Sequence, residues 1–433
     1  MAAVGLVAAL APAQAQRGQA GTEEAIAGDF EALRLTALGQ KRFGRPITPK
    51  NLNLVSSISI SSSKARHNFK PVDCEVLGSL PNLKFISLGR LSLSAACARA
   101  LARAPRLERL SFSGTTLEAG ALRAISKLPG LTTLVMYYVT GLRVEEASDL
   151  RNARGLRSLS ITQGDGVTGG TRIDDTLFRV FAGLPISELY LRGVDLTDAS
   201  ASVIAGLKLN NLRLVDTQFT TQGLQTILEG SPQLRTLQLR NNRRLTSALG
   251  PTIAGLTQLQ NLDLTSMRVG GELGGLGTLA RLRSLKLSNI GVTNDDLTGI
   301  AASPSLTSLQ LSSNPTITDK GYENLAKLTA LRTINLSGSR PTIRGVRALS
   351  TLPELTTLDL SEAQLRGDLS AILARFPKLT SLALSGNAFD RADITRLLKR
   401  TRLRRLSIYR TRVTKPQAKA VRKQFPRTRI LHY

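Results

Sequence analysis

Apolar residues recur along most of the chain at a fixed internal spacing. The stretch LTTLDLSEAQL, residues 355–365, is representative: Leu stands at its first, fourth, sixth and eleventh positions and Ala at its ninth. Most steps between successive units measure 23 to 25 residues, the first step is 28, and one step of 30 follows Leu159. The central apolar position of the pattern can be followed through sixteen units, at Ile58, Ile86, Leu110, Leu134, Leu159, Leu189, Leu212, Leu237, Leu262, Leu285, Leu309, Ile334, Leu358, Leu382, Leu406 and Ile430.

The L-x-L segment of each unit predicts a short β-strand. Successive side chains of a strand point to opposite faces, so the two leucines point inward and the residue between them faces solvent. One such strand cannot bury its leucines alone, and stacked neighbours are needed to build a continuous core. Strands of successive units should pair in parallel about 4.8 Å apart, so sixteen of them would form a sheet on the order of 70 Å long.

The other part of each unit predicts a short helix. At residues 317–325 (ITDKGYENL) and 292–300 (VTNDDLTGI), a Thr, Asn or Asp precedes apolar residues at helical spacing, which is a helix-start signal. A wide helix outside and a narrow strand inside would curve the solenoid, with the parallel sheet on the concave face. Several units place a helix-stopping proline two residues before the next first leucine, at Pro81, Pro105, Pro129, Pro232, Pro304, Pro353 and Pro377.

From about residue 55 to its end, the chain resembles the leucine-rich repeat superfamily. The pattern is L-x-x-L-x-L-x-x-N-x-L, with Ala363 where Asn often stands, and a period of 20 to 29 residues is typical of that family. The units are similar to the ribonuclease-inhibitor-like and bacterial 24-residue classes. This resemblance implies an α/β horseshoe of about 15–16 repeats. Residues 250–277 are rich in glycine and look more like plant-type repeats, so their convex side is expected to be 3₁₀ or irregular.

Three domains are expected. Residues 1–16 are Ala-rich and uncharged, and Ala13-Gln14-Ala15 resembles a signal-peptidase site,. The positively charged start of a signal peptide is missing, so a flexible Ala-rich tail is the alternative. Residues 17–54 should form an N-terminal helical cap, with a helix at 22–38. Residues 55–433 form the repeat domain, in which residues 163–175 should bulge as a loop.

The two cysteines, Cys74 and Cys97, lie one repeat apart. We expect two small buried apolar residues; a disulfide between adjacent convex helices is the alternative in an exported chain.

The sequence offers no recognisable catalytic, cofactor or metal site. His67 and His432 have no Ser or Cys partner at a known spacing,. The acidic pairs Asp174-Asp175 and Asp295-Asp296 stand where helices should begin, so we interpret them as caps. The glycines of VGGELGGLG are not followed by Lys-Ser or Lys-Thr, so no phosphate-binding loop is indicated.

Most solvent-facing strand positions carry Ser, Thr, Asn or Gly. One cluster differs, and it is our candidate protein-binding site because Tyr and Arg are enriched at interface hot spots. The alternative is that these residues simply cover the strand surface. The cluster consists of Tyr137, Tyr138, Tyr190, Arg192, Arg213 and Arg240.

Positive charge is concentrated near the C-terminal end. The chain carries a net charge of +27, and residues 391–433 contain fifteen Lys plus Arg against one acid, Asp393. Such a surface can attract polyanions, while basic residues around an open sheet edge would also oppose edge-to-edge association. The candidate polyanion-binding residues are Arg402, Arg404, Arg405, Arg410, Arg412, Lys415, Lys419, Arg422 and Lys423.

We therefore expect a non-enzymatic protein-binding scaffold without a cofactor, with a partner that is acidic and a chain that is monomeric. The most consistent setting is an exported bacterial protein, periplasmic or secreted, or a host-directed virulence effector delivered into another cell. One alternative is a polyanion binder for nucleic acid, lipopolysaccharide or acidic polysaccharide. Another is a ubiquitin-ligase adaptor acting through residues 17–54, which rests on family analogy alone.

Overall fold

A computed structural model describes residues 4–10, 55–62, 67–68, 71–164, 172–267 and 269–432. The chain divides into two compact units, residues 1–209 and 210–433. The N-terminal helix expected at residues 22–38 and the loop tip at 165–171 lie outside the described residues.

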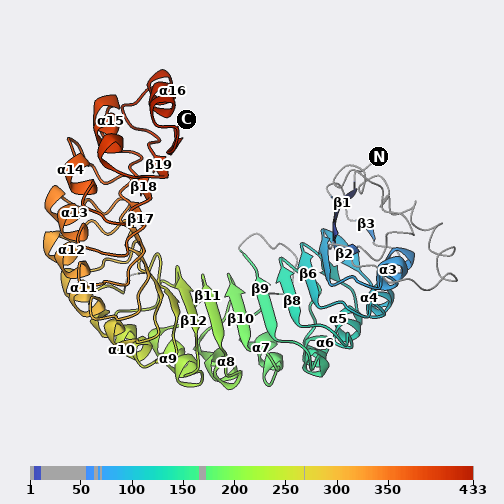
Figure 1. Ribbon diagram of the computed structural model, residues 1–433. Helices are drawn as coiled ribbons and strands as arrows, with labels where there is room; N and C mark the ends of the chain where they lie inside the picture. Colours follow the sequence, from blue (N-terminus) through green and yellow to red (C-terminus); the bar gives the residue numbers. More distant parts are fainter. Residues whose placement is uncertain are drawn as a thin grey trace. The chain divides into compact units, whose positions relative to one another are not determined.

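In the first unit, parallel strands pair in register from one repeat to the next (Figure 1). One further strand, β1, pairs antiparallel with β2. The strands of this sheet are β1 (Val4–Leu10), β2 (Val55–Ser62), β4 (Phe85–Gly89), β6 (Arg109–Ser113), β8 (Thr133–Tyr137), β9 (Ser158–Thr162) and β10 (Glu188–Arg192). Short segments after these strands form a second parallel sheet of β3 (His67–Asn68), β5 (Leu91–Leu93) and β7 (Thr116–Leu117).

The second unit continues the same parallel pairing, but most of its strands are shorter. All sixteen positions predicted to be strand centres lie in strands of one unit or the other. The strands of the second unit are β11 (Asn211–Val215), β12 (Thr236–Arg240), β13 (Asn261–Asp263), β14 (Ser284–Lys286), β15 (Ser308–Gln310), β16 (Thr333–Asn335), β17 (Thr357–Asp359), β18 (Ser381–Ala383), β19 (Arg405–Ser407) and β20 (Arg429–Leu431).

Short α-helices and 3₁₀ turns cover the other face of each sheet (Figure 1). In the first unit these are α3 (Pro71–Gly78), α4 (Ala95–Leu101), α5 (Ala121–Ile125), α6 (Val144–Ala147), η2 (Ser148–Asn152), α7 (Asp175–Phe178), η3 (Arg179–Phe181), η4 (Asp198–Ser200) and α8 (Ala201–Gly206). In the second unit they are α9 (Thr221–Glu229), α10 (Leu249–Ala254), η5 (Gly274–Thr278), α11 (Asn294–Ile300), α12 (Asp319–Leu325), α13 (Ile343–Leu349), α14 (Ser370–Leu373), α15 (Arg391–Arg400) and α16 (Lys415–Gln424).

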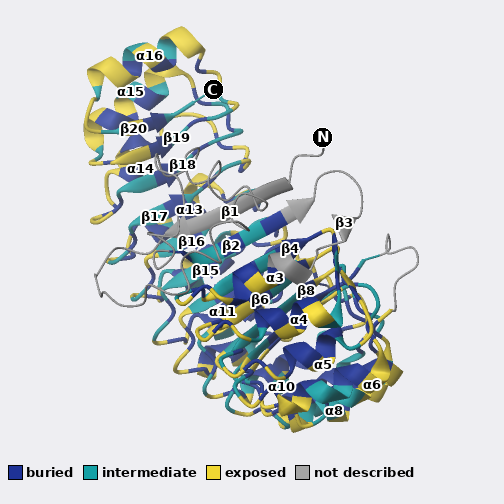
Figure 2. Cartoon of the chain, turned by 90° about the vertical axis from the view of Figure 1, so that its right-hand side faces the viewer, coloured by how far each residue is buried: buried dark blue, intermediate teal, exposed yellow. Residues whose placement is uncertain are grey.

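The core of each unit lies between its sheet and its helices. Strand residues alternate between buried leucines and partly exposed polar residues, as the L-x-L pattern predicts. The helices bury one stripe of apolar residues and expose the other side (Figure 2). The glycine-rich stretch 250–277 is partly as expected: its last residues form the 3₁₀ turn η5, whereas its first residues belong to the α-helix α10.

A tight turn follows the strand of almost every repeat. The second residue after the L-x-L leucines has a left-handed φ, for example 61° at Gly114, 55° at Asn241 and 69° at Gly386. Glycine and asparagine tolerate this conformation best. The buried residue that follows is often polar, and it ties the turn to the preceding repeat.

Asn314 shows how this tie works. Its Oδ1 accepts hydrogen bonds from the backbone N–H groups of Gly291 and Val292, at 3.0 and 3.2 Å. Its Nδ2 donates to the carbonyls of Leu287 and Leu311, at 2.8 and 3.0 Å. The side chain is fully buried, so it satisfies backbone groups that water cannot reach. Asn242 and Asn387 repeat the arrangement.

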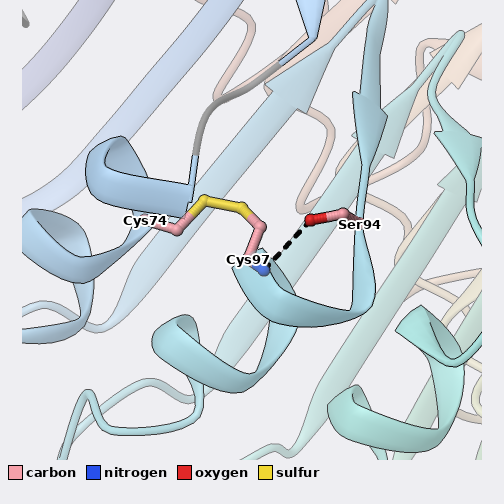
Figure 3. The surroundings of a disulfide bond; sticks show 3 residues. All are labelled: Cys74, Ser94 and Cys97. Atoms are coloured by element: carbon pink, nitrogen blue, oxygen red, sulfur yellow. Dashed lines mark hydrogen bonds between the residues drawn. A yellow bond between two sulfur atoms is a disulfide. The ribbon is translucent and has the colours of Figure 1, made fainter.

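In the first unit a disulfide joins two repeats. Cys74 of α3 and Cys97 of α4 are both buried and are bonded to each other, with their Cα atoms 5.1 Å apart (Figure 3). The expected burial is confirmed, but the cysteines are paired rather than free, because adjacent helices place them at a separation that a disulfide can bridge. Ser94 caps the second helix by accepting from the Cys97 N–H at 3.2 Å.

No helix in the described part of the chain has the length and apolar character needed to cross a membrane.

Candidate binding surfaces

Four of the predicted site residues lie on the exposed sheet face of the first unit, and we call them the tyrosine patch: Tyr137, Tyr138, Tyr190 and Arg192. Strand β9 separates β8 from β10, and the register aligns Tyr137 with Thr162 and Thr162 with Arg192. Tyr190 occupies the middle position of β10, facing the same side. Side chains two strands apart lie about 10 Å from one another, so a single partner can contact all four.

The two adjacent tyrosines pack against each other. Their ring centroids lie 4.4 Å apart at 84°, an edge-to-face arrangement that is favourable for aromatic pairs. Tyr138 occupies the left-handed turn position, with φ 50°, and its backbone N–H donates to the Thr162 carbonyl at 2.8 Å. Its ring lies over Gly164, where an added Cβ would stand only 3.2 Å from it. Tyr137 is left 41% exposed and is one of the few large apolar residues on the described surface.

The other two residues of the predicted cluster belong to the second unit. Arg213 lies at the middle of β11 and Arg240 at the end of β12, and both are exposed. The register pairs Arg213 with Gln238 and Val215 with Arg240, so the two guanidinium groups occupy different columns of that sheet. The structure therefore joins four of the six predicted residues into one patch and describes these two on a separate unit.

The sequence interpretation missed one feature of the first unit's sheet face. Phe85 and Arg109 are aligned on β4 and β6, and the Arg109 guanidinium carbon lies 5.3 Å from the centre of the Phe85 ring. This is cation–π geometry. The signal was present in the sequence, because both residues occupy solvent-facing strand positions where most repeats carry Ser or Thr.

The nine predicted polyanion-binding residues are all exposed, but they are distributed around the last two repeats. Arg402, Arg404 and Arg405 stand at the start of β19, and Arg410 and Arg412 lie beyond its end. Lys415, Lys419, Arg422 and Lys423 belong to α16 on the helix face (Figure 2). Two of the nine are engaged: Arg410 pairs with Glu362 at 2.6 Å, and Arg422 donates to the carbonyls of Ile430 and His432.

One member of each acidic pair takes part in a helix cap, which agrees with the prediction for Asp174 and Asp296. Asp174 accepts from the Leu177 N–H at 2.9 Å, and Asp296 forms a capping box with Thr293. Asp296 also accepts from Gly271 and Leu273 of the previous repeat. Burial opposes ionisation of Asp175, but hydrogen bonds from Ser200 and Thr197 outweigh it and lower the pKa of this carboxyl. No group of three or more His, Cys, Asp or Glu residues suited to a metal ion occurs in the described ranges.

A pocket of about 530 Å³ lies on the helix side of the first unit, between α4, α5 and α6. Its lining contains several alanines together with Arg99, Arg123 and Lys127. Arg123 is already bound to Asp149 at 2.8 Å, and Glu146 reaches into the wall to accept from the Gly120 N–H. The charges are therefore largely balanced.

The fold defines a repeat solenoid with a parallel sheet on one side and short helices on the other. A sequence profile described as Leucine Rich repeat matches residues 302–326. The fold is that of a leucine-rich repeat solenoid, and the profile match covers one of its repeats. No match was found among curated protein sequences.

Several solved structures are similar to this chain. A leucine-rich repeat protein of Leptospira interrogans matches with a TM-score of 0.51 and 18% identity, covering 82% of this chain and 91% of that one. TLR13, solved in complex with ssRNA13, matches with a TM-score of 0.51 and 16% identity; 89% of this chain aligns with 62% of the TLR13 chain. The internalin inlF of Listeria monocytogenes matches with a TM-score of 0.47 and 17% identity, covering 83% of this chain and 95% of that one. These likenesses concern the fold.

Proposed function

We propose that the protein is a non-enzymatic scaffold that binds another protein through the tyrosine patch of its first unit. The observation that carries the proposal is the contrast on one sheet face. The middle column of this sheet carries Ser59, Ser87, Ser111, Val135 and Ser160 before Tyr190, and Tyr137 stands in the neighbouring column. Large side chains that stand beside small ones supply the contact area of an interface hot spot.

The setting we propose is an exported bacterial protein, periplasmic or secreted, with delivery into a host cell as the alternative. The Cys74–Cys97 disulfide supports export, because disulfides persist in oxidising compartments,. The net charge of +27 supports an acidic partner,. Because like-charged copies repel one another, it also supports a monomer. The ligase-adaptor alternative depends on residues 17–54, all of which lie outside the described residues.

The test is a pull-down from envelope and host lysates at about 50 and 200 mM salt. We expect a discrete protein that is retained at the higher salt, because aromatic contacts are insensitive to screening. The triple variant Tyr137→Ala, Tyr190→Ala and Arg192→Ala should lose that protein.

The matched control is Ser87→Ala with Ser111→Ala, on β4 and β6 of the same face. This control should retain the partner. If the triple variant retains it as well, the partner does not bind at the tyrosine patch and the proposal fails.

A further inference from the structure

One column of the second unit's sheet face changes character abruptly. For eight successive strands the first exposed position is short, neutral and polar, and the register aligns these residues directly. On the next two strands the same position is arginine, and Arg405 is aligned with Arg429. We call these two the arginine pair and the eight the polar column: Asn211, Thr236, Asn261, Ser284, Ser308, Thr333, Thr357 and Ser381.

The fold does not require arginine at these two positions. The polar column shows that Ser, Thr or Asn satisfies the same site eight times in succession. Both arginines are exposed, and neither they nor their neighbours Arg402, Arg404 and Arg427 form an ion pair with a carboxylate in the part of the chain that the structure describes. The nearby acids are engaged elsewhere, Glu362 with Arg410 and Asp393 with Arg396.

The chemistry of this cluster suits closely spaced sulfate or phosphate groups. Guanidinium groups bind tetrahedral oxyanions with two parallel hydrogen bonds, which an ammonium group cannot do. Two arginines aligned on neighbouring strands have backbones about 4.8 Å apart. Their side chains can therefore hold one anionic group between them or two that follow each other on a chain.

The adjoining polar column indicates what the rest of the ligand is. It runs from Asn211 to Ser381, a distance of about 34 Å at the usual strand spacing, and carries hydroxyl and amide groups that both donate and accept hydrogen bonds. The rung spacing is close to the length that one pyranose residue adds to an extended glycan. A nucleic acid strand carries a charge on every nucleotide and is usually held by cations and stacking aromatics, and the polar column has neither.

We propose that the second unit binds a linear anionic glycan along the polar column, with its sulfate or phosphate groups held by the arginine pair. This surface is separate from the tyrosine patch, and the proposal does not depend on the proposed protein partner. A phosphate-bearing and a sulfate-bearing glycan share the chemistry that the arginine pair recognises.

The test measures dissociation constants of the full chain for dextran sulfate, dextran phosphate, neutral dextran and an oligothymidylate at about 150 mM salt. We expect one of the two anionic dextrans to bind and neutral dextran to bind at least about tenfold more weakly. Arg405→Thr with Arg429→Thr should weaken binding of the anionic dextran at least about tenfold. Threonine already occupies this position in several preceding repeats, so the variant should fold. Thermal melting checks that it does.

A charge-matched control separates the site from general attraction. Lys419→Thr with Lys423→Thr removes two exposed positive charges from α16 on the helix face, and should change the affinity by less than about twofold because of screening. Arg405→Lys with Arg429→Lys keeps the charge but loses the paired hydrogen bonds, so it should give an intermediate affinity. Equal losses for the two threonine variants would show diffuse attraction and overturn the site.

A further variant tests the polar column. Thr333→Ala, Thr357→Ala and Ser381→Ala should weaken binding of the anionic dextran about threefold or more without changing its salt dependence, since no charge is removed. If this variant binds as tightly as the wild type, the glycan does not lie along the column. If the oligothymidylate binds more tightly than either dextran and loses affinity with the arginine pair, the ligand is a nucleic acid and the glycan assignment is wrong.

Discussion

The two units build the same repeat but connect neighbouring repeats in different ways. In the first unit, the segment after the turn forms short strands of a second sheet, β3, β5 and β7, and a disulfide joins the first two helices. In the second unit, that segment is held instead by buried asparagine amides such as Asn314 and Asn387. Backbone pairing in the first unit and side-chain amides in the second thus satisfy the same backbone groups. The repeat pattern requires that these groups form hydrogen bonds, but it does not fix which partner forms them.

The largest expected effect is the loss of a buried amide in the second unit. Asn314→Ala removes bonds to several backbone groups that have no access to water, so we expect the free energy of unfolding to fall by about 4 kcal/mol. Asn335→Ala, a half-exposed asparagine on the sheet face, is the control and should lower it by less than about 1 kcal/mol. Denaturant unfolding, monitored by hydrogen exchange, measures the free energy of unfolding of both variants. Equal effects would show that the buried amide is not the tie between repeats.

The disulfide should contribute the next largest effect, and only in the first unit. Cys74→Ser with Cys97→Ser, or reduction of the wild type, should lower the stability of that unit by about 2–4 kcal/mol. Because repeats contact only their neighbours, the loss should stay local. Hydrogen exchange should speed up in α3 and α4 and remain unchanged after residue 210. Equal acceleration in both units would contradict the distinction drawn between them.

Substitution of a glycine with a left-handed backbone in the second unit should lower stability by a smaller amount. A second substitution should restore part of that stability. Gly386 has φ 69°, and a Cβ added there would crowd the Glu362 carboxylate, which passes over it to reach Arg410. Gly386→Ala should cost about 1–3 kcal/mol, as a left-handed alanine with a clash. Adding Glu362→Ala removes the clash and should recover part of the loss. If the double variant is no more stable than the single one in denaturant unfolding, a clash between the added Cβ and the Glu362 carboxylate does not explain the loss.

The smallest effect expected is that of a helix cap. Asp390→Ala should lower stability by about 1 kcal/mol at neutral pH, because Asp390 accepts from the Asp393 N–H at 2.9 Å at the start of α15,. That bond is the main reason why the pKa of Asp390 lies below its ordinary value of 3.8. The stabilisation is therefore present above pH 3.8 and lost as the pH falls through the lowered value. Wild type and variant should converge in acid, and a gap that persists there would contradict this account.

The sequence predicted the strands better than the connections between them. Every expected strand centre lies in a strand. The reason is that each repeat carries its own buried leucines at the same spacing, so the signal for the strand lies within the repeat. The left-handed turn after each strand was not predicted, since it is occupied by residues as different as Gly114, Tyr138 and Arg410. Hydrogen bonds between repeats override residue preference there, and a single repeat's sequence does not contain them.

The candidate surfaces were predicted in part for the same reason. Strand alternation correctly placed Tyr137, Tyr190 and Arg192 on the exposed face. The repeat spacing already implied that Arg405 and Arg429 align with the polar column, but a count of charges over residues 391–433 does not use register and so did not separate them from the lysines of α16. Pairing of the cysteines also had to await the structure, since spacing alone left both readings open.

The polar column has a consequence for how a ligand finds its position. Moving one rung along it replaces Ser284 by Ser308, or Thr333 by Thr357, so neighbouring sites are nearly equivalent. A chain lying on such a surface can occupy many offsets of similar free energy, and this degeneracy favours sliding over a fixed pose. The two arginines break the translational symmetry at one end, so they act as a stop that selects one offset from the many.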